Sequence, residues 1–258
     1  MKVPIRKGAE LDAMREAGST AAAVLMKTAA LVRPGVSTLE IDQAAAQFMA
    51  DLGCRSAFLG YRKFPGQICI SLNHEVVHGI GRVDRIIQNG DIVKIDVGVV
   101  KNGWIGDNAT TVPVGMVSPE VHQLLRVTEE SLHVAISHAQ PGGQLRTLCG
   151  SVEAFVNRFG FSVVEQFVGH GVGRQLHEKP EVPNFDNGRI KLRLEPGMVL
   201  AIEPMVNMGV GEVNVLADRW TAVTRDRKPS SHFEHTVVVT ENGPEILTPR
   251  PRLTPPMS

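Results

Sequence analysis

The chain has 258 residues, 43% of them hydrophobic, which is enough apolar sequence to bury one sizeable core. Lysine plus arginine and aspartate plus glutamate number 27 each, so strong non-specific binding to nucleic acid is not expected. The N-terminal residues contain no apolar signal core, and the Ala-rich segment 19–32 is too short and, with Lys27, too charged to span a membrane. A cytoplasmic protein with neither a nucleic-acid nor a membrane partner is predicted.

The hydrophobic pattern predicts helices near residues 8–32 and 38–52, strands within 66–115, helices near 119–139 and 145–158, and strands from 161 to 247. Ser118 followed by Pro119 is typical of a helix start, with serine as the cap and proline in the first turn. The order of elements favours an α+β domain with helices packed on a curved antiparallel sheet. The proline-rich end, 249–258, is predicted to be a flexible tail.

Asn102 and Gly103 separate two strand-like runs and predict a two-residue hairpin turn. Counting outward from this turn places Asp107 opposite Gly98. Asp96 then lies on the same face as Asp107, as a diagonal neighbour roughly 7–8 Å away or less, and Gly98 is expected to leave the space between them empty. A solvated hairpin face is the alternative, but aspartate is disfavoured within strands. A metal site is therefore the preferred interpretation.

Five acidic and imidazole residues occur at or near the ends of apolar, strand-like runs: Asp96, Asp107, His170, Glu203 and Glu234. Carboxylates with one imidazole suit hard or borderline divalent cations, and bridging carboxylates can hold two ions ~3.5–4 Å apart. That spacing is typical of hydrolases that activate water between two metals. The set therefore indicates a metallohydrolase.

The second half of the chain resembles the first at a constant offset in numbering. Segment 90–96 aligns with 197–203, so that Asp96 corresponds to Glu203. Pro-Gly pairs at 34–35 and 141–142, and glycines at 53 and 160, share the same offset. Chance matches among common glycines and prolines are the alternative. The shared apolar pattern favours an internal duplication, with the carboxylates of both halves converging.

Two glycine-rich segments, 78–82 and 169–178, contain His78, His170 and His177. Glycines permit tight turns there, and the three histidines are candidates for contacts with metal or substrate. Neither segment has the spacing of a nucleotide-binding loop. For the other histidines the simpler role of packing or surface residue is adopted, namely for His74, His122, His133, His138 and His232. His235 follows Glu234 in a strand-like run, so alternation points it to the opposite face.

Together, these motifs make the chain, from about residue 5 to 248, resemble the type I methionine aminopeptidases of the pita-bread metallopeptidase fold. The motifs that carry the resemblance are segments 69–73, 76–80, 90–96, 106–107, 169–174, 196–198, 202–205 and 233–236. The resemblance implies a single domain, 1–248, made of two pseudo-symmetric halves. It also implies removal of the initiator methionine from nascent proteins and peptides, with a small second residue preferred.

The resemblance also implies a role for each candidate residue. The five acidic and imidazole residues would bind two divalent metal ions, with Co, Mn, Fe and Zn left open. The catalytic residues would be His78, His177 and Glu203, with Glu203 as the proton shuttle and both histidines touching substrate. The methionine pocket would involve Tyr61, Phe64, Cys69 and Trp220. The implied partners are nascent polypeptide N-termini, with docking at the ribosome left open, and a monomer is expected.

Three positions depart from the commoner pattern of these peptidases: Leu176 replaces an aromatic residue, Phe58 a small one, and Phe64 a frequent tyrosine. The metal ligands are untouched, so these changes affect only the expected shape of the pocket.

Two other functions are weighed. A proline-directed peptidase of the same fold would usually carry a large N-terminal domain, and a non-enzymatic binding module would have lost metal ligands.

The three cysteines, Cys54, Cys69 and Cys149, are an odd number without zinc-finger spacing. No disulfide framework follows from this pattern, and reduced thiols are predicted.

Overall fold

The structure is a computed structural model that describes residues 3–255 and 257. Its helices are α1 (Ala9–Ala29), α2 (Thr38–Asp51), α3 (Pro119–Ser137) and α4 (Leu145–Asn157), with a 3-10 turn η1 (Tyr61–Lys63). The first-half strands are β1 (Arg55–Ser56), β2 (Cys69–Leu72), β3 (Ile92–Lys101) and β4 (Trp104–Pro113). The second-half strands are β5 (Ser162–Val163), β6 (Gly169–Gly171), β7 (Glu178–Val182), β8 (Val199–Ile202), β9 (Met205–Asn207), β10 (Val213–Val215), β11 (Ala222–Thr224), β12 (Ser230–His232), β13 (His235–Thr240) and β14 (Gly243–Ile246).

All four predicted helices are present, and local signals explain two of their starts. At α2 the Ser37 side chain accepts from the Glu40 amide while the Glu40 carboxylate accepts from the Ser37 amide, a capping box. At α3, Ser118 accepts a hydrogen bond from the Val121 amide, and Pro119 occupies the first turn, as predicted. Within the described residues, no helix is both long and apolar enough to cross a lipid bilayer.

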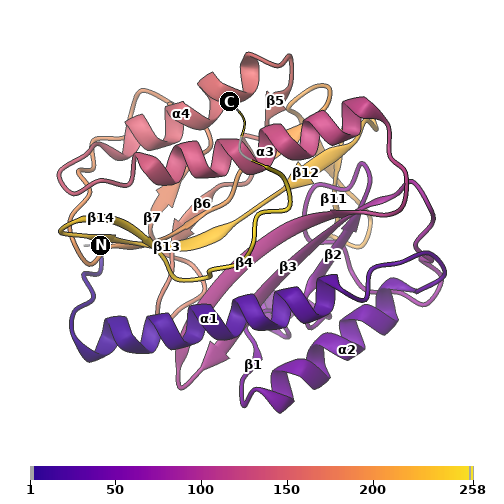
Figure 1. Ribbon diagram of the computed structural model, residues 1–258, viewed down its shortest axis with the longest axis horizontal. Helices are drawn as coiled ribbons and strands as arrows, with labels where there is room; N and C mark the ends of the chain where they lie inside the picture. The colour runs from indigo at the N-terminus through magenta and orange to yellow at the C-terminus, as the bar shows by residue number, and fades with distance from the viewer. Residues whose placement is uncertain (1–2, 256, 258) are drawn as a thin grey trace.

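The strands are antiparallel, and hydrogen bonding divides them into several sheets. β3 pairs with β1, β2 and β4 in the first half, and the largest second-half sheet has the order β14-β13-β8-β6-β7. Smaller sheets join β12, β9 and β5, and β10 with β11. A bridge between Ala109 and Glu234 connects the two halves. In the view of Figure 1, α1 and α2 lie along the bottom, α3 and α4 along the top, and the strands between and behind them. This is the α+β pita-bread arrangement expected from the sequence.

The internal duplication is confirmed by the backbone. α2 and α4 begin at residues 38 and 145, and β3 and β8 begin at residues 92 and 199, so both pairs keep the offset seen in the sequence. Gly35, Gly53 and Gly90 have positive φ, and so do their counterparts in the second half, the glycines at 142, 160 and 197. Isolated bridges join residues 37 and 86 in one half and residues 144 and 193 in the other. Both halves thus use the same turns to present β3 and β8.

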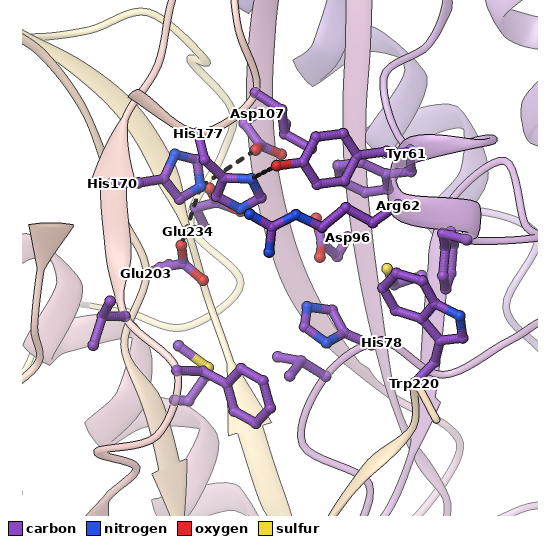
Figure 2. Close-up of a pocket in the computed structure, with 18 of the residues that line it drawn as sticks. Tyr61, Arg62, His78, Asp96, Asp107, His170, His177, Glu203, Trp220 and Glu234 are labelled. Carbon is purple, nitrogen blue, oxygen red and sulfur yellow. Dashed lines mark hydrogen bonds and ion pairs between the residues drawn. The ribbon is translucent and has the colours of Figure 1, made fainter. Parts of the chain in front are cut away.

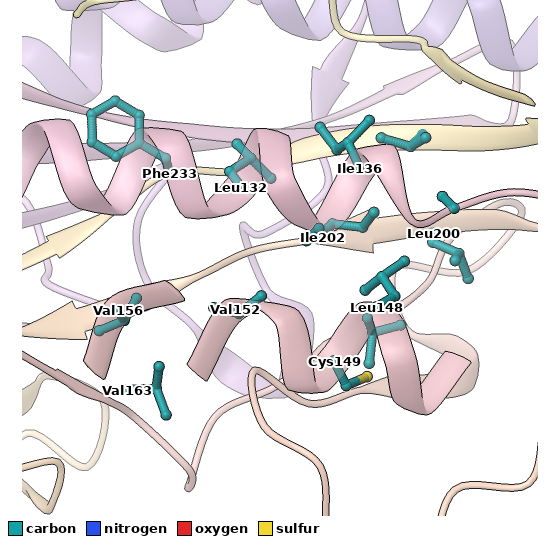
Figure 3. Close-up of a cluster of buried hydrophobic side chains, with 14 of the residues drawn as sticks. Leu132, Ile136, Leu148, Cys149, Val152, Val156, Val163, Leu200, Ile202 and Phe233 are labelled. Carbon is teal, nitrogen blue, oxygen red and sulfur yellow. The ribbon is translucent and has the colours of Figure 1, made fainter. Parts of the chain in front are cut away.

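Each half has its own apolar core. Between α3, α4 and the second-half strands, Figure 3 shows a continuous layer of buried side chains, among them Leu132, Leu148, Val152 and Ile202. A separate cluster joins α1 and α2 to β2 and β3. The strands that carry or flank the candidate metal ligands therefore lie on a rigid support in each half.

Helix α1 packs so closely on the C-terminal part of the chain that Gly18 has no room for a side chain. A Cβ there would lie 2.3 Å from the Leu247 backbone oxygen. Helix propensity favours Gly→Ala by ~1 kcal/mol, but overpacking against backbone costs about 1–3 kcal/mol. Gly18→Ala is thus expected to lower the melting temperature by a few degrees. Ser19→Ala, on the exposed face of α1, is the control and should change it by less than about one degree. A Gly18→Ala protein more stable than wild type in thermal unfolding would contradict this close packing.

Residues 250–254 lie against the body of the protein. The Arg250 guanidinium donates to the Ala109 carbonyl (2.6 Å), and Arg252 donates to Glu130 (2.9 Å). The Leu253 and Thr254 amides donate to the Glu129 carboxylate at 2.8 and 2.7 Å. The flexibility predicted for residues 249–258 stays a prediction, and these contacts argue against it. Residues 256 and 258 of that segment lie outside the described residues.

All three cysteines are free thiols. Cys149 packs in the core of the second half, Cys54 beside the cluster under α1 and α2, and Cys69 among the pocket residues. Burial raises the pKa of the Cys149 thiol to about 12 and that of Cys69 well above its usual value. The prediction of unpaired thiols agrees with this placement.

Candidate metal centre and substrate pocket

The hairpin that carries the first two aspartates has the predicted register. Asn102 and Gly103 both have positive φ, at 51° and 78°, as a two-residue primed turn requires. Asp107 lies opposite Gly98, and Asp96 lies opposite Ala109. Both aspartates line the same cavity.

The space above Gly98 differs from the expectation. A Cβ on this glycine would lie 2.4 Å from Cε1 of Phe58, so the Phe58 ring fills the volume that was expected to be empty. Glycine is required here by the close approach of an aromatic ring.

The second half contributes the other three predicted ligands to the same cavity (Figure 2). His170 is on β6, whose partner β8 is followed directly by Glu203. Glu234 immediately precedes β13, and its backbone pairs with Ala109 of β4. The antiparallel pairing of β6, β8 and β13 therefore brings together residues that are distant from one another in the sequence of this half.

The ligand atoms of Asp107, His170 and Glu234 lie within 4.8 Å of one another. Nε2 of His170 is 3.8 Å from Oδ2 of Asp107 and 3.4 Å from Oε1 of Glu203. Asp107 and Glu234 are almost fully buried, whereas Asp96 and Glu203 are partly buried. All five side chains therefore face one small volume, where a cation would be shared among them.

The tautomer of His170 can be assigned from its partner. Nδ1 lies 2.9 Å from the carbonyl oxygen of Gly171, which only accepts, so Nδ1 carries the proton. Burial lowers the pKa of this imidazole to about 3, and the ring is neutral. Nε2 therefore directs a lone pair at the carboxylates, an arrangement that a cation stabilises and that is usual for metal-binding histidines.

The protonation and hydrogen bonding of the carboxylates indicate that a cation would stabilise this site. Burial, followed by mutual repulsion, raises the pKa values of the four acids well above their usual range. Among the described residues, Oδ1 of Asp96, Oδ1 of Asp107 and Oε1 of Glu234 are buried without a hydrogen-bond partner. Such groups are costly unless a cation or another donor satisfies them. This oxygen-rich set with one imidazole fits divalent metal ions.

His177 and His78 lie beside the carboxylates without belonging to the close ligand group (Figure 2). The His177 ring is 4.3 Å from that of His170 between centroids, and its Nδ1 lies 2.7 Å from the Tyr61 hydroxyl. His78 has a left-handed backbone, with φ of 61°, which is uncommon and often found at functional sites. Burial, with the nearby His177, lowers the pKa of His78 to about 4. Both rings can thus act as neutral hydrogen-bonding groups.

Aromatic, aliphatic and sulfur-containing side chains form most of the rest of the cavity, whose volume is about 300 Å³. Phe64 and Trp220 meet edge to face with centroids 5.1 Å apart. Cys69 lies opposite Asp96 in the β2–β3 register. All four residues predicted for the methionine pocket line this cavity, and so do the two other departures from the family pattern: Tyr61, Phe64, Cys69, Trp220, Phe58 and Leu176.

Some residues near the site were not singled out from the sequence. Arg62 lines the cavity and stacks over Tyr61, and Phe167 packs edge to face on His78. His232, assigned to packing or surface, is 1% exposed and lies beside Glu203. Its position two residues before Glu234, on the same face of an extended segment, was the available signal.

Comparison with known proteins places nearly all of the chain in one family. The profile of metallopeptidase family M24 matches residues 12–241. Methionine aminopeptidase 1 of Bacillus subtilis is 47% identical over 239 residues, which cover 93% of this chain and 96% of that protein. Methionine aminopeptidase of Escherichia coli K12 is 42% identical over 251 residues, which cover 97% and 95%.

Solved structures give the same result. Methionine aminopeptidase from Thermotoga maritima superposes with a TM-score of 0.94 at 39% identity, covering 96% of this chain and all of that chain. Prolidase from Pyrococcus furiosus shares the fold at a TM-score of 0.78 and 24% identity, and the match covers 66% of that longer chain. The fold, the convergence of carboxylates with an imidazole and the sequence match agree, and the chain belongs to metallopeptidase family M24.

Proposed function

We propose that this protein is a type I methionine aminopeptidase, which removes the initiator methionine from nascent proteins and peptides with a small second residue. The observation that carries the proposal is the convergence of four carboxylates, two of them almost fully buried, and one neutral imidazole in a cavity that also has aromatic walls. The names of the relatives that are 42–47% identical over nearly the whole chain support it. The retained ligand set favours an enzyme over a binding module.

The pocket suits a methionine side chain. Its walls combine the rings of Phe58, Phe64 and Trp220 with the Cys69 thiol. A thioether is flexible and polarizable, and contacts between sulfur and aromatic rings contribute about 0.3–1.5 kcal/mol. The departures at Phe58 and Leu176 change the shape of this pocket, while the metal ligands keep their types.

The proposed metal centre consists of Asp96, Asp107, His170, Glu203 and Glu234 and holds two divalent ions, of cobalt, manganese, iron or zinc. When bound, these ions supply Lewis acidity and lower the pKa of a coordinated water. Asp96, with its unpaired Oδ1, accepts a hydrogen bond from the free amine of the substrate. That contact restricts cleavage to the first residue.

Three side chains then handle protons and charge. Glu203 takes a proton from the attacking water and returns it to the leaving amine, since its partly buried carboxylate faces the reaction volume. His177 donates to the carbonyl oxygen as negative charge develops, with the ring held by Tyr61 on its other side. His78, braced by Phe167, positions the nitrogen of the leaving residue. We also propose that the protein acts as a cytoplasmic monomer on chains emerging from ribosomes.

The test is peptide cleavage under several metals. Metal-free protein is reconstituted with Co²⁺, Mn²⁺, Fe²⁺ or Zn²⁺ and offered Met-Gly, Met-Leu and Xaa-Pro peptides. Release of methionine from Met-Gly peptides, slower from Met-Leu and absent from Xaa-Pro, is expected. Faster cleavage of Xaa-Pro peptides, or metal-independent cleavage, would refute the proposal.

A further inference from the structure

His232 is a second imidazole buried beside Glu203, separate from the proposed ligands. Its ring is 1% exposed, and Nε2 lies 3.6 Å from Oε2 of Glu203. Counting every residue that the structure describes, neither ring nitrogen has a hydrogen-bond partner. Leaving a buried donor unsatisfied costs about 1–3 kcal/mol. The Glu203 carboxylate can accept such a hydrogen bond, and it lies only about 0.4 Å beyond hydrogen-bonding distance.

The backbone of His232 is held from the opposite half of the molecule. The Thr111 hydroxyl, on β4, accepts from the His232 amide at 3.0 Å and donates to its carbonyl at 2.7 Å. β12 also pairs with β9, with His232 opposite Met205. The ring is thus placed by two strands that flank the site, and a shift of the Glu203 side chain is the simpler way to close the gap.

The two oxygens of Glu203 have different neighbours. Oε1 faces Nε2 of His170, and that nitrogen carries a lone pair because Nδ1 donates to Gly171. Oε2 faces Nε2 of His232, which is free to carry a proton. Oε1 is therefore suited to share a cation with His170, and Oε2 is suited to accept a hydrogen bond.

We propose that His232 is a positioning residue: its Nε2–H donates to Oε2 of Glu203 and fixes the carboxylate with Oε1 toward the metal and the reacting water. The inference rests on the proposed metal centre. His232 does not line the cavity, so it acts through Glu203 and has no contact with substrate. Partners of this kind change metal affinity or activity by about 10–100-fold when removed.

The first test reads the tautomer in the wild-type protein with diamagnetic Zn²⁺ bound, so that Glu203 is ionised and can only accept a hydrogen bond. ¹⁵N-histidine NMR, with the His232 signals assigned by their loss in His232→Gln, should show a proton on Nε2. The Glu203→Gln change should shift that proton resonance. A proton on Nδ1, or no response to Glu203→Gln, would overturn the proposal, whether or not the protein cleaves methionine.

The second test compares His232→Leu, which removes the donor at similar volume, with His232→Gln, which keeps one. His133→Gln, a half-buried histidine on α3, is the control. Mn²⁺ affinity by calorimetry and kcat are expected to fall about 10–100-fold in His232→Leu, with KM changed less than about threefold and much of the loss restored in His232→Gln.

Unchanged Mn²⁺ affinity in a folded His232→Leu protein would overturn the assignment, as would an equal loss in both variants. If His232→Leu does not fold, the tautomer and His232→Gln decide the matter. Failure of methionine cleavage with normal behaviour in these tests would count against the proposed function alone.

Discussion

Replacing Asp107 or Glu234 by alanine is expected to abolish binding of a metal pair. These two carboxylates form the close ligand group together with His170. Each of the two carboxylates has one buried oxygen without a hydrogen-bond partner among the described residues. Asp107 and Glu234 come from different halves of the chain, and the backbone pairing of Ala109 with Glu234 brings them together. Each carboxylate is therefore expected to bind both ions. Loss of several kcal/mol of charge stabilisation in the transition state corresponds to a fall in kcat on the order of 10³-fold.

The measurements are metal stoichiometry by elemental analysis and thermal unfolding with and without metal. Wild-type protein should gain about 2.7 kcal/mol of stability at a metal concentration one hundred times the Kd, and the variants should gain far less. Without metal, the variants should be no less stable than wild type, because removing one acid relieves repulsion among buried carboxylates. Two tightly bound metal equivalents in either variant would exclude the bridging role.

The His177→Ala change should separate substrate stabilisation from metal binding. His177 lies outside the close ligand group and is hydrogen-bonded to Tyr61. The variant is therefore expected to keep its metals and its fold while kcat falls on the order of 10²–10³-fold, as for removal of one oxyanion donor. KM should move much less. Tyr61→Phe, which removes only the hydroxyl that is hydrogen-bonded to the His177 ring, should give a smaller fall in kcat than His177→Ala.

The matched comparison is His170→Ala, assayed across a metal titration. His170 directs a lone pair at Asp107 and Glu203, so its loss weakens metal affinity first, and excess metal should restore part of the activity. Excess metal should leave His177→Ala unchanged. Wild-type turnover by His177→Ala, or its recovery on adding metal, would remove His177 from the catalytic role.

The sequence predicted what depends on short stretches of chain. The Asn102-Gly103 turn requires positive φ at both positions, and this alone set the register that puts Asp96 and Asp107 on one face. Helix starts followed from capping residues next to them in the chain. The internal repeat indicated two similar halves because the same glycines serve the same turns in each.

Only the tertiary structure decided which distant side chains meet. Phe58 fills the space above Gly98, and the Arg250 guanidinium contacts the strand beside Glu234. His232 was assigned to packing or surface, yet it lies against Glu203. Such contacts depend on how segments that are distant in the sequence pack against one another, and neither periodicity nor local propensity encodes that packing. The residue types of the candidate metal centre are therefore visible in the sequence, whereas the groups that would orient them required the packed molecule.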